Sequence, residues 1–412
     1  MKKIKMKNLI ITGIIIGVLL SFPSATAEEP AWSYETSGSV LSVASAEDVI
    51  VVGSRGGTIS TFGINGALKW RYKTNGDVGS IAIFEDTIAV GSADSNIYVF
   101  EKNTGRVRWN AYAGEFPKVV VSDKAVAAGT YDNQLYVLDK YNGNIIWNKT
   151  GIEEIENIFS LAVSENMLVV ATFDWEVETK GYVRAFDIET GSELWEHKID
   201  GWVYTLAVSD NIIVAGSWEK RKGLVFEQGR GGVYAFDKSG NLKWSFPAVE
   251  DITSVAVSGD RVAFGVGHTY DEDRIYLVDK ETGNVLWDQY TRAPIMDLKS
   301  PYSVQWLALT GDSVIFGARD GKVYTYEKET GCERWSYKTK ADVHTVTAFD
   351  GKVIAGSLDR NVYVFNEGKG SSWCKKQMDK NTLKIIEIGG IIVALIGIVL
   401  LFLLFSGRIG RG

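Results

Sequence analysis

The chain has 412 residues, of which 45% are hydrophobic and 12% aromatic, and it contains 43 glycines but only 6 prolines. This composition excludes a disordered or low-complexity chain and suffices for a large buried core. The formal net charge of −7 makes nucleic acid and anionic lipid surfaces poor partners.

The N-terminus has the three regions of a secretory signal peptide, which we place at residues 1–27. Four lysines precede a short apolar segment from Leu9 to Leu20, and Ala25-Thr26-Ala27 supplies small residues at the expected cleavage position. A retained N-terminal anchor is the alternative. Cleavage after Ala27 would remove four lysines and no acidic residue, so the net charge would move from −7 to −11.

The sequence between the two ends is an internal repeat, in which Trp recurs at intervals of 38 to 49 residues. Each period holds four short segments rich in Val, Ile, Tyr and Phe, separated by turns of Asp, Asn and Gly. In the second period the predicted strands are Ser80–Phe84, Thr87–Ser92, Ile97–Glu101 and Arg106–Tyr112. Four strands per period predict an all-β fold over residues 28–374, an eight-bladed β-propeller of four-stranded antiparallel blades.

The ring needs a fourth strand for its last blade, because the first three strands of a blade occur eight times and the last set ends near Phe365. A closed ring leaves no unpaired sheet edge between the first and last blades. Segments around Trp32 and Trp373 are the two candidates for this strand. We favour Trp32, because Trp32-Ser33-Tyr34 and Trp335-Ser336-Tyr337 have the same three residues in sequence.

Ala185, Asp187, Thr190, Gly191 and Trp195 match the tryptophan-docking motif Ala-x-Asp-x-x-Thr-Gly-x-x-x-Trp, so residues 30–370 resemble the PQQ-like β-propellers. That family includes the quinoprotein alcohol dehydrogenases and the outer-membrane assembly propeller lipoprotein, and the chain resembles its non-catalytic branch. The resemblance implies that each Trp packs between blades against a neighbouring Thr-Gly turn; a carbohydrate-stacking ladder is the alternative. The docking tryptophans are Trp32, Trp70, Trp109, Trp147, Trp195, Trp244, Trp287 and Trp335.

The resemblance also allows an enzyme, but the residues that one would need are missing. The dehydrogenases use a quinone in the channel, a calcium ion, a catalytic carboxylate and a pair of adjacent cysteines. This sequence has only Cys332 and Cys374, which are far apart, and its three histidines have no zinc-site spacing. Its acidic turns do not match a calcium loop. We therefore expect no enzyme, no catalytic residue, no cofactor and no metal site.

Two covalent features follow from export. Cys332 and Cys374 in an exported chain predict a disulfide, with two free thiols as the alternative. The resemblance implies that the turn holding Cys332 would lie beside Trp373 if that Trp docked at its family position. Asn148-Lys149-Thr150 is the only sequon after the signal peptide, so Asn148 is a possible glycosylation site.

Insertions are confined to blades four to seven. They lie between the second and third strands of blades four, five and six (173–181, 218–232 and 267–274) and in the links before blades four and seven (151–157 and 291–302). In a four-stranded meander these connections emerge on one face, which predicts a binding surface there; neutral variation of loops is the alternative. The predicted binding residues are Trp175, Glu176, Trp218, Arg221, Phe226, Arg230, His268, Tyr270, Arg292 and Tyr302.

The C-terminus has the pattern of a membrane anchor. After a linker at 375–384, an unbroken apolar run from Ile388 to Phe405 predicts a transmembrane helix over 385–405. Residues 406–412 carry Arg408 and Arg411 and no acid, which favours a cytoplasmic tail and an extracellular propeller.

The function predicted from these features is a cell-surface, membrane-anchored module. It would bind another protein or an envelope polymer through the loops on one face of blades four to seven. A quinone-dependent dehydrogenase and a purely structural envelope component are the alternatives, and nucleic acid is not an expected partner.

The predicted topology can be tested with a protease added to intact cells. Everything N-terminal to about Lys384 should be degraded, because the propeller is expected outside and only a short tail inside. Immunoblots against tags at the two ends of the chain measure this, with a cytoplasmic protein as the control for intact cells. A propeller that stays protected would reverse the predicted orientation.

Overall fold

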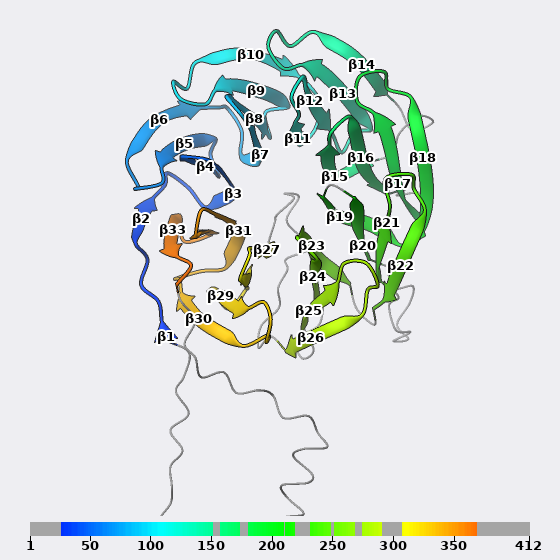
Figure 1. Ribbon diagram of the computed structural model, residues 1–412. Coiled ribbons are helices and arrows are strands. Elements are labelled where there is room, and N and C mark those ends of the chain that lie inside the picture. Colours follow the sequence, from blue (N-terminus) through cyan, green and yellow to red (C-terminus); the bar gives the residue numbers. More distant parts are fainter. Residues whose placement is uncertain are drawn as a thin grey trace, which may run out of the picture.

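The computed structural model describes residues 26–368 apart from 151–156, 174–179, 210, 219–230, 249–250, 268–273 and 291–306. Its strands form eight antiparallel sheets that stand as blades around a central axis (Figure 1). Seven of these sheets have four strands in the described residues, and the seventh blade has a fifth. The eight-bladed propeller expected from the repeat is confirmed.

The first four blades follow one another along the chain, each with its strands in sequential order from the channel outwards. Their strands are β3 (Val40–Ala46), β4 (Val49–Ser54), β5 (Thr58–Gly63), β6 (Leu68–Lys73), β7 (Val78–Phe84), β8 (Thr87–Ser92), β9 (Asn96–Glu101), β10 (Val107–Tyr112), β11 (Lys118–Val121), β12 (Ala125–Gly129), β13 (Gln134–Asp139), β14 (Ile145–Thr150), β15 (Asn157–Ser164), β16 (Met167–Phe173), β17 (Lys180–Asp187) and β18 (Glu193–Asp200).

Blades five to eight repeat this order, and two short N-terminal strands join the outer edges of the last two blades. The strands are β19 (Trp202–Ser209), β20 (Ile212–Trp218), β21 (Gly232–Phe236), β22 (Leu242–Pro247), β23 (Ile252–Ser258), β24 (Arg261–Val266), β25 (Arg274–Asp279), β26 (Val285–Tyr290), β27 (Leu307–Leu309), β28 (Ser313–Gly317), β29 (Lys322–Glu327), β30 (Glu333–Lys338), β31 (Val343–Phe349), β32 (Lys352–Ser357) and β33 (Asn361–Asn366), with β1 (Thr26–Ala27) on blade seven and β2 (Trp32–Glu35) on blade eight.

The second strand of each blade is the centre of the core, which explains its unbroken apolar sequence. Every described residue of β4, β8, β12 and β16 is buried, because neighbouring blades cover both faces. The fourth strands alternate between exposed and half-buried residues, as in β6 and β14, because one side faces solvent at the rim. Burial therefore follows the position of a strand within its blade.

The N-terminal strand β2 closes the ring. It pairs antiparallel with β33, and Trp32 lies opposite Val364, so the last blade reads β2-β33-β32-β31 from the rim inwards. Trp32 thus supplies the fourth strand of blade eight, as favoured from the sequence. The ring is closed by a strand pairing between residues more than 300 positions apart, and the first and last blades have no open edge between them.

Eight indoles connect each blade to the next. Seven of the Trp Nε1 groups donate a hydrogen bond to a backbone carbonyl in the turn between the third and fourth strands of the following blade, and Trp335 donates to the Glu367 carbonyl just after β33 of blade eight, all at 2.7–3.1 Å. In blades one to six, and from blade eight to blade one, the ring also contacts a turn glycine with positive φ. This is the packing that the family resemblance implies. In chain order, the first indole is Trp32 of blade eight, which docks on blade one, and the last is Trp335 of blade seven, which docks on blade eight.

In blades four and six, the turn that receives the indole is shaped by an Asp and a Thr. In blade four the Asp187 carboxylate accepts hydrogen bonds from the backbone N–H groups of Glu189 and Thr190 and from the Thr190 hydroxyl. These bonds, with those from Thr190 first, hold the pKa of Asp187 below its usual value. The motif residues therefore fix the turn on which Trp147 docks.

The docking contact gives a testable prediction at Gly105, which has φ of +69° and lies under Trp70. A Cβ at this position would lie 2.5 Å from Cδ2 of the indole, so Gly105→Ala should separate blades one and two. We expect a loss of roughly 2–4 kcal/mol, the sum of left-handed strain and overpacking. The shift of the urea or thermal unfolding midpoint measures it.

The matched control is Gly259→Ala. Gly259 also has positive φ, +60°, but nothing lies within 4 Å of its would-be Cβ, so this variant carries the backbone strain alone. It should lose about 1 kcal/mol. Equal midpoints for the two variants would show that the indole contact contributes little to stability.

Candidate binding face of the propeller

The two faces of the ring differ in the connections that they carry. Because the strands of each blade run antiparallel in sequence order, the turns between strands one and two and between strands three and four lie on one face, which we call the turn face. The turns between strands two and three and the links between blades lie on the other, which we call the insertion face. The strand ends that flank the five predicted insertions all belong to the insertion face.

Of the predicted binding residues, Trp218 is the one that the structure describes. It is the last residue of β20 and pairs with Trp202 of β19, so the blade-five connection begins after Trp218 rather than at it. The prediction of Trp218 as a loop residue is therefore wrong, because the strand extends one residue further to reach a ring partner. The others lie outside the described residues: Trp175, Glu176, Arg221, Phe226, Arg230, His268, Tyr270, Arg292 and Tyr302.

Trp218 belongs to a cluster of seven aromatic rings on the insertion face of blades three to five. Ring centroids lie 4.4 Å apart for Phe159 and Phe173, 4.4 Å for Phe159 and Tyr204, and 4.9 Å for Trp202 and Trp218. We call this set the aromatic cluster. Its members are Phe116, Tyr131, Phe159, Phe173, Trp202, Tyr204 and Trp218.

The aromatic cluster is not part of the repeat. Tyr131, Phe173 and Trp218 occupy the same position, just after or at the end of the second strand of blades three, four and five. The equivalent residues in blades one, two, six, seven and eight are not aromatic, as with Ala93 in blade two. Sequence reasoning found Trp218 but missed the other six rings. An aromatic at this one position in three consecutive periods was the signal available.

Buried titratable groups lie at the same end of the channel. Lys118, the first residue of β11, is 3% exposed, and its ammonium lies 5.5 Å from the centre of the Tyr131 ring. Burial lowers the pKa of Lys118 to about 7. Burial, and then the charges of Tyr131 and Asp251, raise the pKa of Tyr204. Part of the insertion face is therefore an aromatic surface that includes the Tyr204 phenol and has the buried Lys118 amine against the Tyr131 ring.

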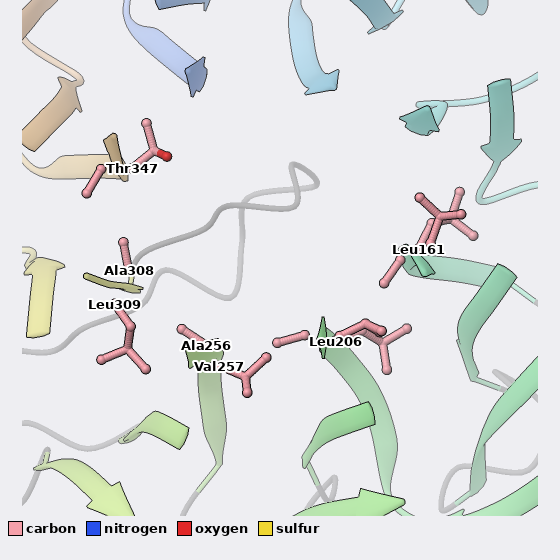
Figure 2. Close-up of a pocket in the computed structure, with 12 residues that line it drawn as sticks. Leu161, Leu206, Ala256, Val257, Ala308, Leu309 and Thr347 are labelled. Atoms are coloured by element: carbon pink, nitrogen blue, oxygen red, sulfur yellow. The ribbon is translucent and has the colours of Figure 1, made fainter. Parts of the chain in front are cut away.

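The opposite end of the channel is apolar. A cavity of about 350 Å³ is lined by the second halves of the innermost strands of blades four to eight, towards the turn face (Figure 2). Leu161, Leu206 and Leu309 are among the residues that line it, and Thr347 gives the one hydroxyl among its lining side chains. In the part of the chain that the structure describes, no three His, Cys, Asp or Glu side chains are grouped to hold a metal.

Two histidines can be placed. His344 is buried in β31, and His197 in β18 stacks on Phe236 with Nε2 near the Gly240 carbonyl. Asn148, the predicted glycosylation site, is exposed on β14.

Within the described ranges no helix has the length and apolar character to cross a membrane, and the predicted span at 385–405 lies outside them.

The ring of docked tryptophans and the four-stranded blades define the class of protein, a PQQ-like propeller. The family model described as outer membrane protein assembly factor BamB matches residues 24–150, 113–263, 179–364 and 271–409. The chain belongs to this family. The resemblance stated from the docking motif is thereby confirmed.

Individual relatives agree with this assignment. The outer membrane protein assembly factor BamB of Bordetella pertussis is 27% identical over 155 residues, which is 38% of this chain and about a third (36%) of that protein's length. Among solved structures, BamB from Moraxella catarrhalis superimposes with a TM-score of 0.61 and 17% identity, over 82% of this chain and 100% of that one. The computationally designed Ika8 protein gives 0.66 with 20% identity, over 82% and 100%. These structures show a shared fold.

The disulfide gives a prediction that uses both cysteines. Cys332, in the turn before β30, is disulfide-bonded, and the other cysteine of the sequence, Cys374, lies outside the described residues. We expect non-reducing peptide mapping to find Cys332 linked to Cys374. Cys374→Ser should free the Cys332 thiol and lower the unfolding free energy by about 2–4 kcal/mol. Wild-type protein with an alkylatable thiol at Cys332 would contradict the pairing.

Lys118 gives a prediction about pH. Its folded pKa of about 7 lies below the unfolded value, so between these two pKa values the unfolded chain binds a proton that the folded chain does not. Stability should therefore rise as pH increases from about 7 towards 10, and the penalty should be full below 7. Lys118→Met should raise the melting temperature at pH 6 and flatten this slope.

Exposed Lys124 is the control position, because it lies at the surface in a salt bridge with Glu189. Lys124→Met should leave the slope between pH 7 and 10 unchanged. An unchanged slope in Lys118→Met as well would show that the buried amine is not its source.

Proposed function

We propose that this protein is a non-catalytic binding scaffold of the cell envelope, which is held at a membrane and binds another protein or an envelope polymer through the insertion face of blades four to seven, together with the part of the aromatic cluster that extends onto blade three. The observation that carries the proposal is the aromatic cluster. It is the described feature of the insertion face that departs most from the repeat, and it lies beside the strand ends where the insertions begin.

The aromatic cluster has the properties of an interface surface. Phe116, Tyr131, Phe159, Tyr204 and Trp218 are each partly exposed, whereas Phe173 and Trp202 beneath them are buried. Aromatic side chains with this partial exposure supply much of the binding energy in protein interfaces. Because the rings are packed against each other on strands, little side-chain entropy would be lost when a partner covers them.

The relatives support an assembly role. The matched family and the Bordetella pertussis relative are both named as an outer membrane protein assembly factor. A role in assembly fits a scaffold that holds other proteins. The anchor that we propose here is the C-terminal segment 385–405 with a basic tail, and the propeller would face outwards. The partner would then be another envelope component reached from the outer side of that membrane.

Tyr131→Ala tests the proposed interface. Removing this ring, which contacts Phe116 and Phe159, should reduce recovery of the partner from detergent-solubilised membranes by at least about tenfold, the effect of a typical interface hot spot. Quantitative mass spectrometry of the co-purified proteins measures it. The melting temperature should change by a few degrees at most, because Tyr131 is only half-buried.

Tyr141→Ala is the matched control, since Tyr141 is 58% exposed in the turn between β13 and β14, on the opposite, turn face of the ring. It should change neither partner recovery nor stability. A second variant shortens 219–230 to the Ala93–Asn96 turn of blade two and keeps Trp218 in place. Full recovery with both Tyr131→Ala and the shortened chain would rule out this face. Reduction of a dye by the wild type with quinone and calcium would instead favour the dehydrogenase.

A further inference from the structure

Blade seven differs from the other blades at its outer edge. The short strand β1 pairs there with β30 in parallel, with Thr26 opposite Trp335 and Ala27 opposite Ser336. Among the described residues the other seven sheets end at their fourth strand. Figure 1 shows β1 at the rim beside β30, where the N-terminal segment passes on towards β2 of blade eight.

Burial shows the effect of this extra strand. Ser follows the docking Trp in three blades, as Ser33, Ser245 and Ser336. Ser33 and Ser245 are exposed, whereas Ser336 is half-buried. The indole before it follows the same trend, because Trp335 is 3% exposed and Trp244 is 8% exposed. The edge of blade seven is therefore covered where the equivalent edge of blade five is open to solvent.

The hydrogen-bond pattern of β30 identifies the groups that the edge offers. Thr339 donates its backbone N–H to the Gly321 carbonyl at 2.7 Å, just beyond the end of the β29–β30 pairing. Inward and outward bonding alternates along an antiparallel strand, so Trp335 and Tyr337 bond towards β29. Ser336 therefore turns its backbone N–H and C=O outwards, to the side on which β1 lies.

The edge is also held rigidly. Trp335 donates its indole N–H to the Glu367 carbonyl of blade eight at 3.0 Å, and the disulfide-bonded Cys332 immediately precedes β30. Glu29, just after β1, is close enough to Tyr337 for its charge to raise the pKa of that phenol, after the larger effect of burial. A strand edge fixed in this way needs little reorganisation to accept a further strand.

We propose that the outer edge of blade seven is a strand-accepting site for an extended segment of a protein partner, and that the end of the signal peptide occupies it first. Cleavage after Ala27 would remove β1 and expose the backbone groups of Ser336. The segment that fits is an extended peptide with small side chains, aligned parallel to β30 and held by main-chain hydrogen bonds. This site is on the rim and does not depend on the insertion face.

The test uses the full chain beginning at Glu28, purified in detergent, and a fluorescent peptide with the sequence of residues 22–29, FPSATAEE. Saturable binding by fluorescence anisotropy is expected. Ser336→Pro should weaken it by at least about tenfold, because Pro removes the outward N–H while an edge strand tolerates it. Ser245→Pro, at the same position of blade five, should stay within about twofold of the unmodified chain.

A second measurement does not depend on the folding of a proline variant. The chain that retains residues 1–27 should bind the peptide at least about tenfold more weakly than the chain beginning at Glu28, because its own β1 already covers the edge. Equal binding by these two chains, equal effects of the two prolines, or no saturable binding would overturn the proposal. None of these results would bear on the insertion face, whose test is partner recovery with Tyr131→Ala.

Discussion

The docking of an indole from each blade onto a turn of the next is the constraint on which the rest of this structure depends. The contact needs a Trp near the start of the fourth strand, a tight turn, which Asp and Thr shape in blades four and six, and a glycine whose lack of Cβ lets the ring approach. It recurs around the whole ring, including the step from Trp32 to blade one. Because the ring is closed, each blade is supported on both sides and no sheet face is left open between neighbours.

This contact also explains why the chain varies on one face. The docking turns and the Trp positions lie towards the turn face, where the connections must keep their length to hold the indole in register. On the same face, lysines reach back to the preceding blade, as Lys140 does to Glu85 at 3.1 Å. The docking contact does not involve the connections of the insertion face, so segments can lengthen there without opening the ring.

Two surfaces of different chemistry result from one rigid ring. On the insertion face, rings from three blades meet in the aromatic cluster, which offers side chains to a partner. At the rim, blade seven offers a backbone edge next to a disulfide and a docked indole. The first surface would recognise shape and apolar area, and the second would recognise an extended backbone. A scaffold that holds two components at once would need such separation.

The sequence by itself determined the number of blades, most strand boundaries and the docking ladder. Local sequence patterns predict these features: alternation of residue types within a strand, turn residues at fixed offsets, and a Trp in every period. The strand Thr87–Ser92 has the same bounds in the structure as in the sequence prediction. The order of residues around Trp32 also favoured the strand that closes the ring.

Only the tertiary structure decided which residues from different repeats contact each other. Tyr131, Phe173 and Trp218 are some 40 residues apart in the chain, and they join one cluster because consecutive blades place equivalent positions side by side. Trp218 is a strand residue because Trp202 pairs with it, which no turn pattern indicates. Thr26 reaches Trp335 only when the ring is closed. Contacts of this kind depend on the path of the whole chain, so a local pattern does not contain them.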